Sequence, residues 1–161
     1  MSQTAQAALL AKRWSEFSED AISLMSSPQA TTGMDTEVYP SWSVHDLLAH
    51  LASTQSAVPK LVEAALSKSA GSGDDRPFDA DRWNASQVRR RQEVSVQDLR
   101  LELVAASREL NRLLLGLSDD DLDLPVPIGA GRGNELGQVL SEMADHQSNH
   151  LADVARRLKR P

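Results

Sequence analysis

Three of the four histidines in this chain stand where their side chains could bind one metal ion. His146 and His150 are four residues apart, and in a helix such residues lie one turn apart on the same side, with about 5–6 Å between their Cβ atoms. His50 ends a separate stretch that begins at Trp42. One helix that supplies a His-x-x-x-His pair, and a second helix that supplies one more histidine, together predict a three-nitrogen metal site.

Imidazole ligands narrow the choice of metal. Neutral imidazole nitrogens suit zinc, nickel, copper or iron, and a set of three leaves coordination positions for water or a substrate. The alternative interpretation is that these are ordinary polar histidines on the flanks of two helices. His45 lies five residues before His50, about 140° around the same helix, so we do not expect it to act as the proton acceptor.

The hydrophobic pattern predicts the helices that would carry these histidines. Apolar residues recur at three- and four-residue spacings in four stretches, near residues 4–26, 43–68, 84–117 and 134–159. Ser43 and Asp46 form a capping-box pattern that fixes the start of the second helix. We therefore expect an all-α four-helix bundle without a sheet, as a single domain over residues 1–161. His50 would meet the His146/His150 pair if the second and fourth helices are neighbours.

The third helix has two alternative starts. Ser95 and Asp98 form another capping-box pattern, which either begins the main helix or lies inside a longer, bent helix that starts near Asn84. Apolar residues then alternate at three and four over residues 96–117, which predicts packing in an antiparallel bundle. The stretches between the helices are rich in glycine, proline and small polar residues and are predicted loops, at residues 28–42, 67–77 and 118–133.

Composition excludes several classes of function. The 161-residue chain has a net charge of −6, which argues against nucleic acid or an anionic membrane as its main partner. It contains no cysteine, so any thiol chemistry needs a thiol carried by a small molecule. No stretch approaches a membrane-spanning length of apolar residues, and the N-terminal residues lack a signal-peptide pattern. We expect a cytoplasmic protein that acts on a small molecule.

The chain resembles the DinB-like family, which includes the N-terminal domain of mycothiol-dependent maleylpyruvate isomerase. The order of the motifs and the positions of the loops agree over nearly the whole chain. Three pieces carry the resemblance: the stretch from Trp42 to His50, the run Asp81-Arg82-Trp83-Asn84, and the pattern His146-x-x-x-His150-x-x-Asp153.

This resemblance implies that His50, His146 and His150 bind a divalent metal ion such as zinc, nickel or iron. It further implies a transferase or isomerase that uses a low-molecular-weight thiol, such as mycothiol or bacillithiol, on a small electrophile. The metal would lower the pKa of the thiol and hold the thiolate ready. The isomerase branch usually has Glu where His146 stands, so the all-histidine set resembles the general DinB pattern more closely. The alternatives are a bundle that hydrolyses or sequesters a small toxic molecule without a thiol, or one with a purely structural metal.

Further expectations follow from the same resemblance, although no catalytic residue emerges. Asp153, one turn beyond His150, would orient that imidazole or bind a substrate amine, the alternative being a partner on the helix surface or solvent. Trp83 and Asn84 would line the mouth of the site, or else be a core indole and a helix cap. The resemblance also implies a homodimer formed through helix faces. In the sequence only Ile22 supports this, because it lies off the apolar stripe of the first helix and could be exposed.

Overall fold

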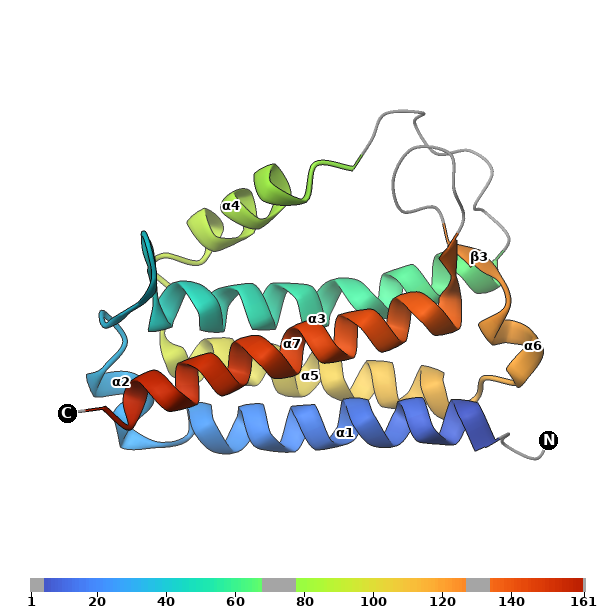
Figure 1. Ribbon diagram of the computed structural model, residues 1–161, viewed down its shortest axis with the longest axis horizontal. Helices are drawn as coiled ribbons and strands as arrows, with labels where there is room; N and C mark the ends of the chain where they lie inside the picture. The colour runs from blue at the N-terminus through green and yellow to red at the C-terminus, as the bar shows by residue number, and fades with distance from the viewer. Residues whose placement is uncertain (1–4, 68–77, 127–133, 161) are drawn as a thin grey trace.

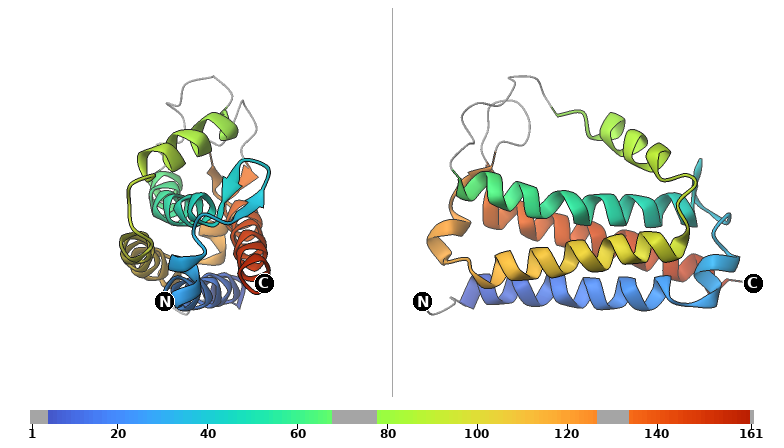
Figure 2. Two further views of the ribbon diagram at one scale, coloured as in Figure 1. Left: turned by 90° about the vertical axis from the view of Figure 1, so that its left-hand side faces the viewer. Right: turned by 180° about the vertical axis from the view of Figure 1, so that it is seen from behind.

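Four long helices form the body of the molecule (Figure 1). The computed structural model describes residues 5–67, 78–126 and 134–160. Each long helix packs against two of the others, since α1 and α3 both contact α5 and α7. An end-on view shows the four helices side by side, with α4 outside them over α3 (Figure 2). The bounds of the long helices are α1 (Ala5–Met25), α3 (Val44–Leu66), α5 (Val96–Leu115) and α7 (Leu136–Leu158).

The helix directions differ from a simple up-and-down bundle. In Figure 1, α1 and α7 run one way and α3 and α5 run the other way. The long connection that contains α4 (Ala80–Arg90) returns the chain to the end where α3 began, so α3 and α5 are parallel. The predicted antiparallel packing of the third helix is therefore confirmed against α1 and wrong against α3. The pairing that matters for the histidines, α3 with α7, is antiparallel.

The all-α bundle is confirmed, and three of the four predicted helices have nearly the expected bounds. The prediction of one helix over residues 84–117 is wrong, because the chain breaks between α4 and α5. Ser95 causes the break, since its hydroxyl accepts a hydrogen bond from the backbone N–H of Asp98 at 3.0 Å and so caps a new helix.

The expectation that there is no sheet is also wrong. The described residues contain two antiparallel strand pairs: β1 (Glu37–Tyr39) with β2 (Trp42–Ser43), and β3 (Pro125–Val126) with β4 (Asn134–Glu135). Ser41, in the turn between β1 and β2, has a positive φ of 67°. Two short helices lie in the predicted loops, α2 (Pro28–Thr32) and α6 (Asp119–Leu122). The rest of the predicted loops at 68–77 and 127–133 lies outside the described residues.

Leucine and alanine fill most of the core, with Trp14 and Phe17 as its large aromatic members. Ile22 is half-buried and packs against that core, so it is not the exposed apolar residue that was expected from the sequence. Over the described residues, no helix has the length and apolar character to cross a membrane.

Candidate metal centre

The start of α3 fixes the position of His50. Ser43 and Asp46 form the predicted capping box: the Ser43 hydroxyl accepts from the Asp46 N–H at 3.1 Å, and the Asp46 carboxylate accepts from the Ser43 N–H at 2.9 Å. His50 follows one turn later on the side that faces α7. Because α3 and α7 are antiparallel neighbours, this point of α3 lies opposite the middle of α7, where His146 and His150 stand.

The three imidazoles converge through their Nε2 atoms. His146 Nε2 lies 3.2 Å from His50 Nε2 and 3.1 Å from His150 Nε2. Two nitrogens bound to one tetrahedral zinc at about 2.0–2.1 Å would lie about 3.3 Å apart. The spacing of these two pairs therefore fits ligands of one ion, and the three residues form a cluster that could hold a metal. With the third pair, His50 and His150, included, the ligand atoms of the three rings all lie within 4.8 Å of one another.

Burial lowers the pKa of each histidine in this cluster and so favours the neutral form. His50 is only 4% exposed, His150 is half-buried, and His146 reaches the surface. Burial, helped by the neighbouring His150 and His146, lowers the pKa of His50 to about 4. Burial also lowers the pKa of His146, and burial together with the charge of His146 lowers the pKa of His150. Neutral imidazole is the form that binds a metal, so the apoprotein already presents the ligands in the right state.

Packing against Trp42 helps to orient the His50 ring. The Trp42 indole stands edge-on to it, with the ring centroids 5.9 Å apart and the planes at 90°. The Nδ1 atom of His50 is buried and has no hydrogen-bond partner among the described residues. The ring therefore offers one nitrogen, Nε2, to the cluster, while Trp42 and the surrounding helix hold the other side.

His150 is held by a chain of polar contacts that begins on the β1–β2 hairpin. Its Nδ1 atom lies 3.0 Å from the Tyr39 hydroxyl, which in turn donates a hydrogen bond to Asp153. Arg156 completes the chain through an ion pair with Asp153. With Nε2 directed at the cluster, Nδ1 carries the proton and donates it to the Tyr39 oxygen, the arrangement that metal-binding histidines usually have. Asp153 thus acts on His150 through Tyr39 and does not contact the ring itself.

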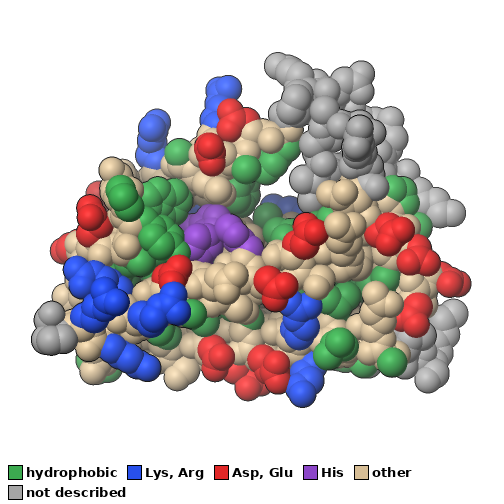
Figure 3. Space-filling model, in the orientation of Figure 1, with side chains coloured by type: hydrophobic (Ala, Val, Ile, Leu, Met, Phe, Trp, Pro, Cys, Tyr) green, Lys and Arg blue, Asp and Glu red, His purple; other side chains and the backbone are tan. Residues whose placement is uncertain are grey.

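A cavity of about 420 Å³ opens on the same cluster. It lies between α3, α7 and α4, and Figure 3 shows the histidines at the surface in a recess there, with hydrophobic side chains beside them. Trp83 and Asn84 do line it, together with His50 and His146. The described lining contains no Asp, Glu, Lys or Arg; its other members are Thr54, Ala57, Val58, Leu61, Phe78, Ala80 and Met143.

The fourth histidine stands apart from this cluster. His45 Nε2 lies 2.7 Å from the carbonyl oxygen of Val94, so it joins the start of α3 to the turn before α5. Its absence from the site agrees with its expected direction on the helix.

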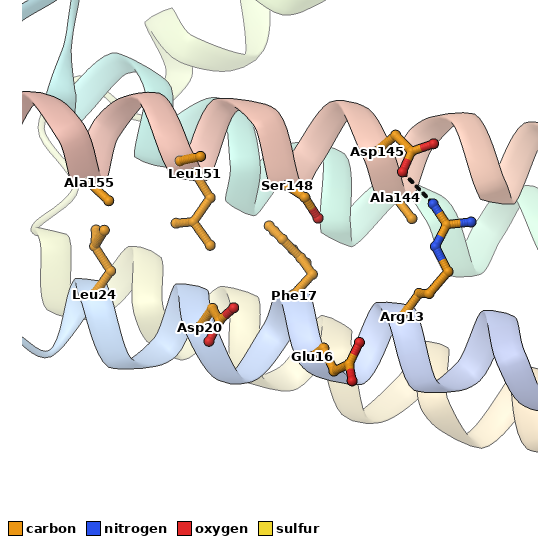
Figure 4. Close-up of a pocket in the computed structure, with 11 residues that line it drawn as sticks. Arg13, Glu16, Phe17, Asp20, Leu24, Ala144, Asp145, Ser148, Leu151 and Ala155 are labelled. Carbon is orange, nitrogen blue, oxygen red and sulfur yellow. Dashed lines mark hydrogen bonds and ion pairs between the residues drawn. The ribbon is translucent and has the colours of Figure 1, made fainter.

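Another groove, of about 430 Å³, runs between α1 and α7 (Figure 4). Arg13 closes one end of it, where its guanidinium pairs with Asp145 and donates to the Ser141 hydroxyl at 2.7 Å. Apolar side chains, acidic side chains and Ser148 line the rest, and none of the histidines does. We regard this groove as part of the packing interface between α1 and α7, because the contacts of Arg13 with Ser141 and Asp145 join those two helices.

Sequence reasoning missed Tyr39, and named Trp42 only as the first residue of the stretch that ends at His50. Both stand in or beside a stretch without helical periodicity, which gave no sign of where its side chains point. The available signals were that Tyr39 is the only tyrosine in the chain, and that it lies close before a well-marked helix start.

Comparison with known proteins agrees with this architecture. The family model of the DinB superfamily matches residues 4–154. The chain therefore belongs to the DinB superfamily. No curated protein and no solved structure matches it significantly.

Proposed function

We propose that this chain is a metal-dependent enzyme that brings a low-molecular-weight thiol to a small electrophile, as a transferase or an isomerase. The observation that carries the proposal is the histidine cluster at the edge of a 420 Å³ cavity, in which His146 Nε2 lies 3.2 Å from His50 Nε2 and 3.1 Å from His150 Nε2. His50, His146 and His150 would hold the ion, with zinc, nickel and iron as the candidates. When bound, such an ion lowers the pKa of a thiol and stabilises the thiolate.

The position of the cavity favours a reactive site over a structural one. His50 and His146 reach the cavity wall, whereas His150 is backed by Tyr39. A ligand in the cavity would thus approach the cluster from one open side. A structural site, in contrast, has four protein ligands and no open position.

The lining of the cavity bears on the substrate. Phe78, Leu61 and Met143 offer apolar surface, and Thr54 and Asn84 offer hydrogen bonds. A neutral electrophile with an apolar body fits these side chains, whereas a dicarboxylate would find no cationic side chain among them. In a transfer, the thiolate sulfur bonds to the electrophilic carbon, the leaving group departs with its bonding pair, and the thiol proton goes to solvent.

A cysteine-free chain allows a direct test of the thiol. Cobalt-substituted protein should develop a sulfur-to-cobalt charge-transfer band when mycothiol, bacillithiol or glutathione is added, because no protein thiol can produce it. His45→Ala is the matched control and should keep the band, since His45 lies outside the cluster. His50→Ala should lose it. Trp83→Ala should keep the metal and weaken the binding of an electrophile.

The opposite result would change the function assigned to the site. If none of the three thiols gives a band, and the cobalt protein instead turns over an ester or an amide, the proposed thiol chemistry is wrong and a hydrolase replaces it.

A further inference from the structure

A second, smaller cavity lies behind the histidines, at the carboxyl end of α7. Its volume is about 170 Å³, and its lining is Val38, Tyr39, Asp153, Arg156, Arg157 and Arg160. Three arginines thus line one small surface cavity in a chain whose net charge is −6. Figure 3 shows Lys and Arg side chains gathered over this end of α7, on the left of the histidines.

The guanidinium groups keep donors free for a ligand. Arg156 pairs with Asp153, and Arg157 uses its Nε–H on the Glu37 carbonyl oxygen at 2.8 Å. The side chain of Arg160 has no partner within the described part of the chain. Asp153 is the one acidic side chain in the described lining, so three positive charges face a single negative one.

Basic residues in the last turn of a helix have an ordinary explanation, since they stabilise its carboxyl end. That explanation accounts for the residue types and not for the cavity that they enclose with a tyrosine hydroxyl from another element. Planar guanidinium forks match the geometry of phosphate and carboxylate groups. The cavity is also smaller than the roughly 300–1,000 Å³ of sites for drug-sized ligands.

We propose that Arg156, Arg157 and Arg160, with the Tyr39 hydroxyl, form a binding site for a small oxyanion of the phosphate or carboxylate type. The oxyanion would compete with Asp153 for Arg156. It would lie beside the same tyrosine that holds His150, on the side of the histidine cluster away from the 420 Å³ cavity. The proposal does not depend on the thiol chemistry.

The single tyrosine provides a reporter inside this site. Protein labelled with 3-fluorotyrosine gives one fluorine NMR resonance, that of Tyr39. Inorganic phosphate should shift this resonance saturably, with a dissociation constant of about 1 mM or tighter. Sodium chloride at equal ionic strength should not produce a saturable shift. A phosphate monoester and a dicarboxylate, titrated in the same way, identify which oxyanion the site prefers.

Matched double variants separate this site from general charge and from the histidines. Arg157→Gln/Arg160→Gln should weaken phosphate binding at least about tenfold, because it removes two of the three guanidinium groups. Arg89→Gln/Arg90→Gln, at the exposed end of α4, removes the same charge and should leave binding unchanged. The proposal is wrong if no oxyanion shifts the resonance saturably, or if the first double variant binds phosphate as the wild type does.

Discussion

At the scale of single residues, Tyr39 connects the histidine cluster to the rest of the molecule. Tyr39 belongs to the β1–β2 hairpin, and its hydroxyl contacts His150 Nδ1 and donates a hydrogen bond to Asp153. Burial raises the pKa of Tyr39, while the charge of Arg156 opposes that rise, so the phenol stays protonated and can donate to Asp153. The Tyr39 hydroxyl thus accepts a hydrogen bond from His150 and donates one to Asp153.

Removing that hydroxyl should weaken metal binding without removing a ligand. We expect Tyr39→Phe to lower the metal affinity by about 10–100-fold, the usual effect of losing the partner of a metal-binding histidine. Asp153→Asn should act in the same direction. Asp145→Asn is the control, because Asp145 lies in the α1–α7 groove. Competition with a chromophoric chelator measures the affinity, and equal affinity in Tyr39→Phe and wild type would contradict the role given to the hydroxyl.

The lowered pKa values of the three histidines predict the pH dependence of the apoprotein. In the unfolded chain His50 takes up a proton near pH 6.5, whereas in the folded chain it does so only near pH 4. The unfolded state therefore binds more protons in this window, and stability should fall as the pH drops from about 6.5 to about 4. His146 and His150 shift in the same direction.

The site should consequently keep its metal affinity at a lower pH than a site made of histidines with an ordinary pKa would. The sequence alone predicts a fall below about pH 6.5, where an unperturbed histidine is protonated. With the three pKa values lowered, proton competition should begin below that pH. Affinity measured from pH 7.5 down to 5 tests this, and a midpoint at 6.5 would show that the cluster is not buried as described.

At the scale of elements, α4 is the most weakly anchored wall of the cavity. It has no fully buried residue, although it contributes Trp83 and Asn84 to the lining. Arg91, at its carboxyl end, is fastened to Glu102 of α5 by two hydrogen bonds of 2.6 and 3.0 Å. Ser56 of α3 also donates to Glu102. Burial acts to raise the pKa of Glu102, but these hydrogen bonds outweigh it and lower the pKa, so the carboxylate stays charged.

Breaking this anchor should loosen α4 and leave the histidines in place. We expect Arg91→Gln to speed amide exchange over residues 80–90 and to weaken ligand binding in the cavity, at a cost of about 1–3 kcal/mol for the contact. Metal affinity should not change. Arg112→Gln is the matched control, because it removes an equal charge from an exposed ion pair with Glu109. Equal exchange rates over residues 80–90 in the two variants would contradict this account of α4.

At the scale of the whole molecule, the sequence predicted what depends on periodicity. Helical spacing placed His146 and His150 on one side of a helix, and the capping box at Ser43 fixed where His50 falls. The loop before that box has no repeat that reveals where its side chains point, so Tyr39 was not found. Likewise, the spacing of apolar residues could not decide whether residues 84–117 form one helix or two. The break depends on whether the Ser95 hydroxyl caps a helix or faces solvent.

The homodimer stays a prediction that rests on the family resemblance. Ile22, its one support from the sequence, packs partly against the core. We expect twice the chain mass by light scattering at micromolar concentration. A mass of 17.6 kDa across that range would contradict the dimer.

The central claim is that a single divalent ion binds where His50, His146 and His150 meet. The most direct test is the metal content of protein purified without an affinity tag, for the wild type and for the variant His146→Ala/His150→Ala. We expect about one zinc, nickel or iron ion per chain in the wild type and none in the variant, which should remain a folded bundle because neither histidine is fully buried. Equal metal in the two proteins, or no metal in a folded wild type supplied with these ions, would contradict the claim.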